Sequence, residues 1–321
     1  MPEIRQNPFT DEFSIINDKR LQRPSATSKD SICPFCTTGE KRHPGLPTKY
    51  GVMAFENLFP ALKLSNANIE TSKNPITPTF PAVGICEVVL YSDNHDLQFQ
   101  DMNVGEIENL ICLWIERYNL LGNKPEINYV YIFENRGEAV GVTIHHPHGQ
   151  IYAFPFIPPK IKKILENCEK HYKTSKNSCL MCGILKKELE AQDRVIIENN
   201  TFIAFVPYYA KLLFEVHVAP KNHHSSIKTL SREEITDLAN LLKDLRRKYD
   251  LLFEKQHAFM MMFFQNPTDG EERPFYHFTI EFLSLERDGV RYKYRAGVET
   301  GLEFWTNDLS PEKSAELLRK L

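Results

Sequence analysis

The sequence predicts an α+β fold built from two duplicated halves. Three observations support this prediction: one order of sequence features occurs twice, each copy begins with a Cys-x-x-Cys pair, and each copy ends near a histidine that follows an aromatic segment. Repeats are sought first because a missed repeat changes the whole fold assignment. With 321 residues the chain is long enough for two ordinary domains, and we place them at residues 1–170 and 171–321.

In each predicted half, the Cys-x-x-Cys pair precedes a strand-like apolar run that ends at a proline. The first run covers residues 52–55 and leads to Pro60, and the second covers residues 202–205 and leads to Pro207. The proline lies 24 residues after the second cysteine in the first half and 25 residues after it in the second.

A glutamate and a histidine, eight residues apart, come next and precede a helix. Glu87 leads to His95 in the first half, and Glu215 leads to His223 in the second. The apolar residues that follow recur every three or four positions, which is the period of a buried helix face. The second helix also begins with a capping box at residues 231–234. The two predicted buried faces are Ile107, Leu110, Ile111, Trp114, Ile115, Tyr118 and Leu121, and then Ile235, Leu238, Leu241, Leu245, Tyr249 and Leu252.

An aromatic strand follows each helix, at residues 129–133 and 259–264. Phe133 precedes His146 by 13 residues, and Phe264 precedes His277 by 13 residues. Two unrelated α+β halves with accidental spacings are the alternative. The shared order of elements and the matching intervals favour an internal duplication.

Each half therefore supplies two cysteines and two histidines at matching positions. Two thiolates and two imidazoles form a common tetrahedral zinc set, and four protein ligands close the coordination sphere. We therefore predict two structural zinc ions per chain, which brace the fold and do not activate water. The predicted ligand sets are Cys33, Cys36, His95 and His146, and Cys179, Cys182, His223 and His277.

A redox role for the Cys-x-x-Cys pairs is the alternative. Thioredoxin-like pairs stand at the start of a helix in a βαβ unit, and the sequence pattern lacks that context. The odd total of seven cysteines argues against a disulfide framework. We interpret Cys86, Cys112 and Cys168 as small buried apolar residues. The histidines that we interpret as ordinary hydrogen-bonded or surface residues are His43, His171, His224 and His257.

The segment at residues 145–150, His-His-Pro-His-Gly-Gln, is where we place the chemistry. Its proline favours an extended backbone, and alternate side chains of an extended strand share one face. His146, His148 and Gln150 then project together. The second half has no additional histidine two residues after His277. The asymmetry predicts structural sites in both halves and chemistry in one.

We predict that His148 is a catalytic nucleophile for phosphoryl-type transfer. A neutral imidazole is nucleophilic, its reference pKa is about 6.5, and its bond to phosphorus is labile enough to be attacked in turn. His146, held on the metal, would orient its neighbour. Gln150 is the second predicted catalytic residue, as a donor to a phosphate oxygen on which charge builds. The alternative is that His148 binds an anion without reacting.

This segment, together with residues 133–137 (Phe-Glu-Asn-Arg-Gly) and Gly141, resembles the active-site signature of the galactose-1-phosphate uridylyltransferase family, in the histidine-triad superfamily. The resemblance covers nearly the whole chain. It implies two histidine-triad-like halves, each an antiparallel sheet with helices packed on one face, joined in one extended sheet. It also implies a homodimer whose second subunit completes the active site. Some family members hold iron in the second half through a His-x-His segment, but this chain has Thr279 and Glu281 there, as expected for two-zinc relatives.

The resemblance also implies which residues bind substrate. These residues are Arg20, Arg23, Asn57, Asn135, Thr143, Gln150, Lys293 and Glu299. The two arginines would contact the diphosphate, Asn57 the uridine, Asn135 and Thr143 the phosphates, and the last two residues the hexose phosphate. Leu58 departs from the family's acidic residue, and an expected glutamine is not evident in residues 301–306. Without the resemblance, the arginines would be interpreted as a solvated turn and the asparagines as local backbone caps.

The implied reaction is a ping-pong uridylyl transfer. His148 attacks the α-phosphorus of UDP-glucose, glucose 1-phosphate leaves, and galactose 1-phosphate takes the uridylyl group. One alternative is an adenylyltransferase or phosphorylase of the same family that acts on ADP-glucose or another nucleotide sugar. Another is a non-catalytic, zinc-stabilised nucleotide-binding protein, which the intact His148 and Gln150 disfavour.

Composition excludes several other classes of protein. The formal net charge of -3 gives no bulk attraction to nucleic acid or to an anionic membrane, and finger spacing is absent. No apolar run approaches the roughly 18 residues of a membrane span, and the N-terminus lacks a signal-peptide core. We therefore expect a cytoplasmic enzyme whose partners are a nucleotide sugar and a hexose 1-phosphate.

Overall fold

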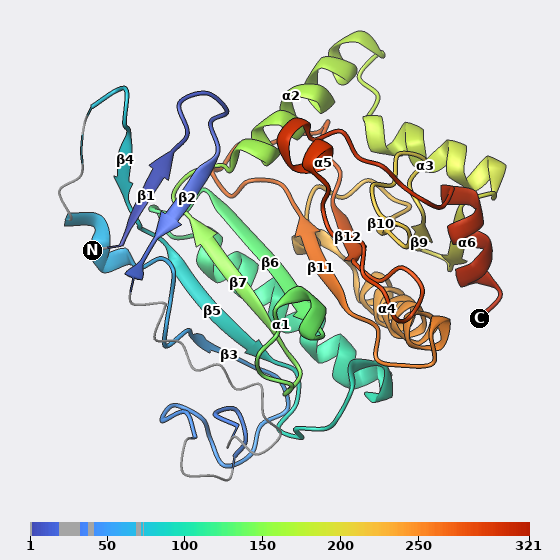
Figure 1. Ribbon diagram of the computed structural model, residues 1–321, viewed down its shortest axis with the longest axis horizontal. Helices are drawn as coiled ribbons and strands as arrows, with labels where there is room; N and C mark the ends of the chain where they lie inside the picture. Colours follow the sequence, from blue (N-terminus) through green and yellow to red (C-terminus); the bar gives the residue numbers. More distant parts are fainter. Residues whose placement is uncertain (1, 19–32, 38–41, 69–71, 73) are drawn as a thin grey trace.

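The structure is a computed structural model, and it describes residues 2–18, 33–37, 42–68, 72 and 74–321. Its centre is one nine-stranded sheet in which neighbouring strands run antiparallel (Figure 1). In spatial order the strands are β3 (Met53–Glu56), β5 (Ile85–Leu90), β7 (His148–Phe154), β6 (Tyr129–Arg136), β11 (Phe259–Phe264), β12 (Thr279–Ser284), β10 (Val216–Pro220), β9 (Phe202–Phe205) and β8 (Val195–Glu198).

The two halves meet in the middle of this sheet, where β6 pairs with β11. Arg136 lies opposite Phe259 and Phe133 lies opposite Met262. The strand order β5-β7-β6 on one side of this junction is mirrored by β10-β12-β11 on the other. The expectation of two duplicated halves joined in one extended antiparallel sheet is therefore confirmed.

Two long helices cover one face of the sheet and pack against each other. Figure 1 shows both behind the strands: α1 (Val104–Gly122) and α4 (Arg232–Leu252). Each begins at a capping box, formed by Asn103 and Glu106 in α1 and by Ser231 and Glu234 in α4. A side chain at the cap satisfies backbone N–H groups that have no partner within the helix. The apolar side chains of these helices and of the facing strands form one continuous core.

The remaining helices lie between and after the strands. The α-helices are α2 (Pro159–Thr174), α3 (Leu180–Ala191), α5 (Gly297–Leu302) and α6 (Pro311–Arg319). Short 3-10 helices of the described residues are η2 (Leu64–Asn68), η3 (Phe99–Asp101), η4 (Glu138–Val140) and η5 (Ile227–Thr229). In the described part of the chain, no helix is long and apolar enough to cross a membrane.

A second, three-stranded sheet was not predicted from the sequence. Its strand order is β2 (Phe13–Ile16), β1 (Glu3–Gln6) and β4 (Thr79–Pro81). Ile4 of this sheet belongs to the same apolar cluster as Cys86, with Tyr152 and Phe154 of β7 packed against it. The small sheet therefore covers part of the face of the first half that α1 and α4 leave open.

Pairing register corrects one detail of the predicted duplication. Gln150 and Glu281 each lie four residues after the histidine of their half, and they pair with Phe133 and Met262. Phe133 therefore corresponds to Met262 and not to Phe264, although the latter has the equal 13-residue interval. The segment from this position to the histidine is two residues longer in the second half.

The predicted burial of the three isolated cysteines holds in part. Cys86 is buried and Cys168 is half-buried, but Cys112 is exposed. Cys112 follows Ile111 on α1 and lies outside the stripe that faces the sheet. A helix turns by about 100° per residue, so the burial of Ile111 does not imply burial of Cys112.

Candidate active site and metal clusters

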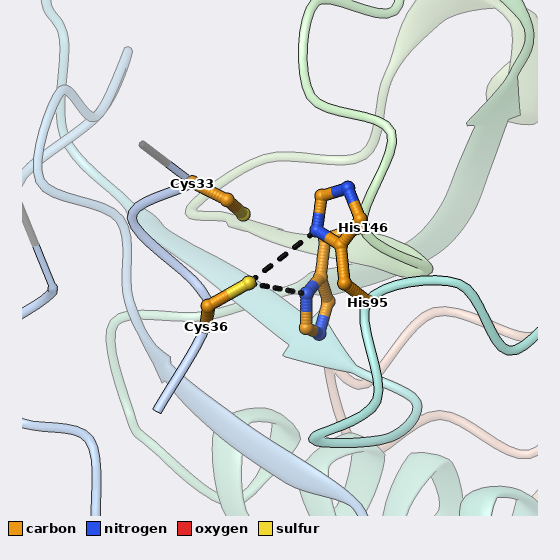
Figure 2. Close-up of side chains that lie close together, drawn as sticks. All are labelled: Cys33, Cys36, His95 and His146. Atoms are coloured by element: carbon orange, nitrogen blue, oxygen red, sulfur yellow. Dashed lines mark hydrogen bonds between the residues drawn. The ribbon is translucent and has the colours of Figure 1, made fainter. Parts of the chain in front are cut away.

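The first predicted ligand set converges at one end of the sheet. Cys33 and Cys36 come from the segment before β3, His95 from the loop between β5 and α1, and His146 from the loop that leads into β7. Their ligand atoms all lie within 4.8 Å of one another. Figure 2 shows the Sγ atom of Cys36 directed at both imidazoles, 3.4 Å from Nδ1 of His95 and 3.8 Å from Nδ1 of His146.

Backbone contacts fix the orientation of His146. Its Nε2 donates to the carbonyl oxygen of Ser92 at 2.7 Å, which leaves Nδ1 directed at the cysteines. Burial lowers the pKa of His146 to about 4, so the ring is neutral at neutral pH. A neutral imidazole whose second nitrogen is hydrogen-bonded to a carbonyl is the form that binds metal ions.

The second half repeats this arrangement. The ligand atoms of Cys179, Cys182, His223 and His277 again lie within 4.8 Å of one another. Sγ of Cys182 is 3.5 Å from Nδ1 of His223 and 3.4 Å from Nδ1 of His277. Nε2 of His277 donates to the carbonyl oxygen of Pro220 at 3.0 Å, as His146 does to Ser92 in the first half.

The second cysteine pair stands at the start of a helix, which is one of the two features of a thioredoxin-like site. Cys179 is the N-cap of α3. The hydrogen bond with Cys182, the largest influence, and the contact with His277 lower the pKa of Cys179 to about 3, against the opposing effect of burial. The βαβ unit of a thioredoxin-like site is not found, since all strand pairs within the described residues are antiparallel.

Donor chemistry supports metal binding at both clusters. Each offers two sulfur and two imidazole nitrogen atoms, a set that closes a tetrahedral shell around a borderline-soft divalent ion. Each cluster also draws its ligands from three separate segments of its half. A bound ion would therefore tie those segments together.

The structure places His148 and Gln150 on one face of β7, as predicted. Residues 149, 151 and 153 of this strand are buried toward α1, whereas 148, 150 and 152 alternate with them. Gln150 lies between Val88 of β5 and Phe133 of β6 in the pairing register. Side chains two apart on a strand share a face, so the two predicted catalytic side chains project together.

One hydrogen bond defines the chemistry available at His148. Its Nδ1 lies 2.8 Å from the carbonyl oxygen of His146. A carbonyl oxygen only accepts, so Nδ1 carries the proton and Nε2 keeps a free lone pair. Burial lowers the pKa of His148 below its usual value, which keeps the ring neutral at neutral pH. Nε2 is therefore available as a nucleophile.

The other predicted residues near His148 occupy different surroundings. Asn135, near the end of β6, lines a small cavity of about 40 Å³ together with His148. Thr143 lies half-buried in the loop between β6 and β7. Asn57 follows β3, and its Oδ1 accepts from the backbone N–H of Phe59 at 2.9 Å. The local backbone cap considered for the asparagines is therefore present at this position.

Lys293 and Glu299 lie together and form an ion pair with each other. Nζ of Lys293 donates to Glu299 at 2.7 Å, and Thr306 and the backbone N–H of Ala296 also donate to this carboxylate. Glu299 is 1% exposed, and these donors, Lys293 first, hold the pKa of its carboxyl well below its usual range. Glu299 thus fixes the start of α5 and the position of Lys293. Arg20 and Arg23 lie outside the described residues.

Three buried polar residues behind His148 were not assigned from the sequence. They are Tyr91, which follows β5, Glu134 of β6 and Arg246 of α4. A signal was present, because Arg246 interrupts the apolar stripe of its helix and Glu134 falls at a helix-facing position of its strand. A charge at a buried position requires a partner, but the sequence does not say which.

Fold and site together define a class of protein: a duplicated α+β protein in which both halves carry a thiol–imidazole cluster and one half carries an additional histidine whose Nε2 is available for chemistry. Comparisons with known proteins give the family. Residues 4–158 match the model of the galactose-1-phosphate uridyl transferase N-terminal domain, and residues 166–321 match that of the C-terminal domain. The chain belongs to the galactose-1-phosphate uridylyltransferase family.

Individual relatives agree with this assignment over the full length. A galactose-1-phosphate uridylyltransferase of Thermotoga maritima is 38% identical, over 100% of this chain and 98% of that protein. A solved uridylyltransferase structure superposes with a TM-score of 0.87 at 29% identity, covering 99% of this chain and 97% of that one. An ADP-glucose phosphorylase of Arabidopsis thaliana with bound ADP-glucose gives a TM-score of 0.76 at 25% identity, covering 100% of this chain and 99% of that one.

Proposed function

We propose that the chain exchanges a uridylyl group between UDP-glucose and galactose 1-phosphate. The observation that carries this proposal is that Nε2 of His148 has a free lone pair. The hydrogen bond from Nδ1 to the carbonyl oxygen of His146 keeps the proton on the other nitrogen. The relative from Thermotoga maritima, similar from end to end, is a galactose-1-phosphate uridylyltransferase. The nucleophile and the family thus point to the same reaction.

In the first half-reaction, Nε2 of His148 attacks the α-phosphorus of UDP-glucose. The new bond is phosphorus–nitrogen, and the phosphorus–oxygen bond to glucose 1-phosphate breaks, with the electron pair leaving on that phosphate. The ring gains positive charge, which the carbonyl of His146 stabilises through the Nδ1 proton. In the second half-reaction, a phosphate oxygen of galactose 1-phosphate attacks the same phosphorus and releases Nε2. The ping-pong route divides one displacement into two easier ones.

The neighbouring residues bind and orient the substrate in this proposal. Gln150 donates its side-chain amide to a phosphate oxygen, and Asn135 and Thr143 bind further phosphate oxygens. Lys293 binds the hexose phosphate, and the buried Glu299 positions Lys293 for that contact. The remaining proposed contacts are those of Arg20 and Arg23 with the diphosphate and of Asn57 with the uridine.

We also propose that both clusters hold zinc. The metal supplies structural bracing, because four protein ligands leave no open position. His146 belongs to the first cluster and His148 follows it by two residues, so the cluster fixes the backbone from which the nucleophile projects.

The proposed organisation has two halves, residues 1–170 and 171–321, in a cytoplasmic homodimer. The division falls inside α2, which follows the last strand of the first half. Cysteine pairs that serve as metal ligands are typical of a reducing compartment. The exposed side chains of Leu302 and Phe304, 77% and 73% accessible in the single chain, suit burial against a second subunit.

A same-family enzyme that acts on ADP-glucose is the second candidate. The likeness to an ADP-glucose phosphorylase structure over the entire chain favours it, at a TM-score of 0.76. The histidine chemistry is identical in both candidates, so nucleotide selectivity separates them.

Labelling of the protein tests the proposal. The protein is mixed with UDP-glucose or with ADP-glucose labelled at the α-phosphate, and acid-labile, base-stable label on protein is measured. We expect label from UDP-glucose and its complete loss in His148→Ala, with Thr279→Ala as the matched control in the other half. Label from ADP-glucose alone would support the second candidate. No label from either would indicate a non-catalytic nucleotide-binding protein.

A further inference from the structure

We propose that Tyr91, Glu134 and Arg246 form a positioning network that holds β7, and with it His148, in the position that the reaction requires. The inference rests on the proposed function, because it concerns the geometry of that transfer. The network begins in the second half, on α4, and ends at the backbone on either side of the nucleophile. Each of its three links is a contact between buried residues.

The first link is the ion pair between Arg246 and Glu134. Arg246 is fully buried and donates through Nη2 to Oε1 of Glu134, which is 5% exposed. The guanidinium carbon lies 4.0 Å from the ring centroid of Phe99 and 5.0 Å from that of Phe259. Among the described residues, Nε and Nη1 of Arg246 have no hydrogen-bond partner. The buried cation therefore depends on this carboxylate and on two aromatic rings.

The second link joins Glu134 to Tyr91. The hydroxyl of Tyr91 donates to Oε2 of Glu134 at 2.8 Å, so the carboxylate uses one oxygen for each partner. The ring of Tyr91 packs edge-on against Phe99 and Trp114. A carboxylate shared between a guanidinium and a phenol has little freedom to move, and it fixes the position of the phenol oxygen.

The third link runs from Tyr91 to the segment that carries the nucleophile. The backbone N–H of Tyr91 donates to the carbonyl oxygen of Pro147 at 3.2 Å. On the other side of His148, a Cβ atom added to Gly149 would lie 2.5 Å from the hydroxyl oxygen of Tyr91. Real Cβ atoms do not approach so closely, so this strand rests directly on the hydroxyl. Tyr91 thus contacts the residues immediately before and after His148.

This arrangement has a catalytic consequence. A near-attack geometry requires about 3–3.5 Å between the reacting atoms, and a displacement of about 1 Å can lower the rate by about 100-fold. One cavity of about 40 Å³ is lined by His148 and by all three network residues, Tyr91, Glu134 and Arg246. A displacement of the network would therefore displace His148. We therefore assign these three residues a positioning role and no contact with substrate.

The test compares two tyrosines. Tyr91→Phe removes the hydroxyl of the network, and Tyr249→Phe removes an equally buried hydroxyl on α4 that donates to the carbonyl of Phe214 at 2.7 Å. Rapid mixing with labelled UDP-glucose measures the rate of uridylyl-enzyme formation. We expect about a tenfold lower rate in Tyr91→Phe with unchanged KM and metal content, and a rate within about twofold of wild type in Tyr249→Phe. Equal effects of the two substitutions on the rate would overturn the inference.

A second set of variants separates positioning from stability. Arg246→Met leaves the buried Glu134 without its cationic partner and should lower Tm, and adding Glu134→Gln should restore Tm because the network then holds no unpaired charge. We expect the double variant to stay at least about tenfold slower than wild type and Arg246→Lys to regain part of the rate. A double variant with the wild-type rate would contradict the positioning role. Absence of label on the wild-type protein would overturn the proposed function and this inference with it.

Discussion

Strands β7 and β12 occupy corresponding places in the two halves, but they carry different chemistry. Each follows the histidine of a thiol–imidazole cluster, His146 or His277. Two residues after this histidine, the first half has His148 and the second has Thr279. Four residues on, Gln150 faces Val88 and Phe133, whereas Glu281 faces His217 and Met262. The cluster of two cysteines and two histidines is repeated, and the additional histidine is not.

The difference shows which features a duplicated fold retains and which it loses. A metal ion bound at either cluster would tie loops to the sheet of its half. The proposed reaction uses one nucleophile, His148. In the second half the corresponding face carries polar contacts between side chains, with Nε2 of the buried His217 3.0 Å from Oε1 of Glu215 and 4.0 Å from Oε1 of Glu281. The face that we propose to bind substrate in the first half thus carries internal polar contacts in the second.

The largest expected contrast comes from breaking each cluster in turn. Cys36→Ser and Cys182→Ser should each reduce bound zinc from about two ions per chain to about one, and both should lower Tm. Cys36→Ser should also lower kcat by about 10–100-fold, because its cluster holds the turn before His148. Cys182→Ser should leave the kcat of the folded protein within about threefold of wild type. Metal analysis, calorimetry and steady-state kinetics measure these effects.

Equal losses of kcat in the two variants would contradict the division between bracing and chemistry. The exposed Cys112→Ser serves as the control, since this thiol belongs to neither cluster.

Acid should destabilise the junction between the halves through a buried histidine outside both clusters. Burial, with smaller contributions from Arg136 and Lys255, lowers the pKa of His257 to about 3. Its unfolded value is about 6.5, so between these two pH values the unfolded chain binds more protons and stability falls as pH falls. His257→Gln should therefore lose less Tm than wild type between pH 7 and about 5.

Thermal unfolding at a series of pH values provides the measurement, with His171→Gln on α2 as a control. The backbone carbonyl of His257 accepts from Arg136 of β6, which places this histidine beside the pair of strands that joins the halves. If Tm falls equally with pH in wild type and in His257→Gln, His257 is not a source of the acid sensitivity.

The smallest expected effects come from the two helix caps, one in each half. The side chain of Asn103 accepts from the backbone N–H of Glu106 at 3.0 Å, and that of Ser231 accepts from Glu234 at 3.2 Å. Asn103→Ala and Ser231→Ala should each lower the free energy of unfolding by about 1 kcal/mol, without a change in kcat. Urea unfolding measures this loss. A large fall in kcat in either variant would show that the helices do more than support the sheet.

The sequence was sufficient for the two clusters because their ligands recur in one order around similar elements. It was sufficient for the shared face of His148 and Gln150 because strand alternation is a local property. Equal spacing was less reliable: Phe264 matches Phe133 by interval, but Met262 matches it by register. Loop length can change without altering the strands that a loop connects, so intervals across loops do not define equivalent positions.

The positioning network could not be predicted, for a different reason. Tyr91, Glu134 and Arg246 come from three elements that lie far apart in the sequence, and their contacts arise only when α4 packs on the sheet. Glu299 gives a similar lesson. The resemblance implies that it binds substrate, which stays a prediction, but not that its carboxylate accepts from Lys293, Thr306 and the backbone N–H of Ala296. Burial of a charge depends on tertiary contacts that a linear pattern does not specify.

The pairing of β6 with β11 has a consequence for either half taken alone. Each of these strands has its second neighbour only in the other half, so separation would leave a row of unpaired backbone N–H and C=O groups along an apolar strand. Such an edge recruits another strand. The continuous chain keeps the matching strand covalently attached and therefore at high effective concentration, which directs the open edge to its own partner instead of to a neighbouring molecule.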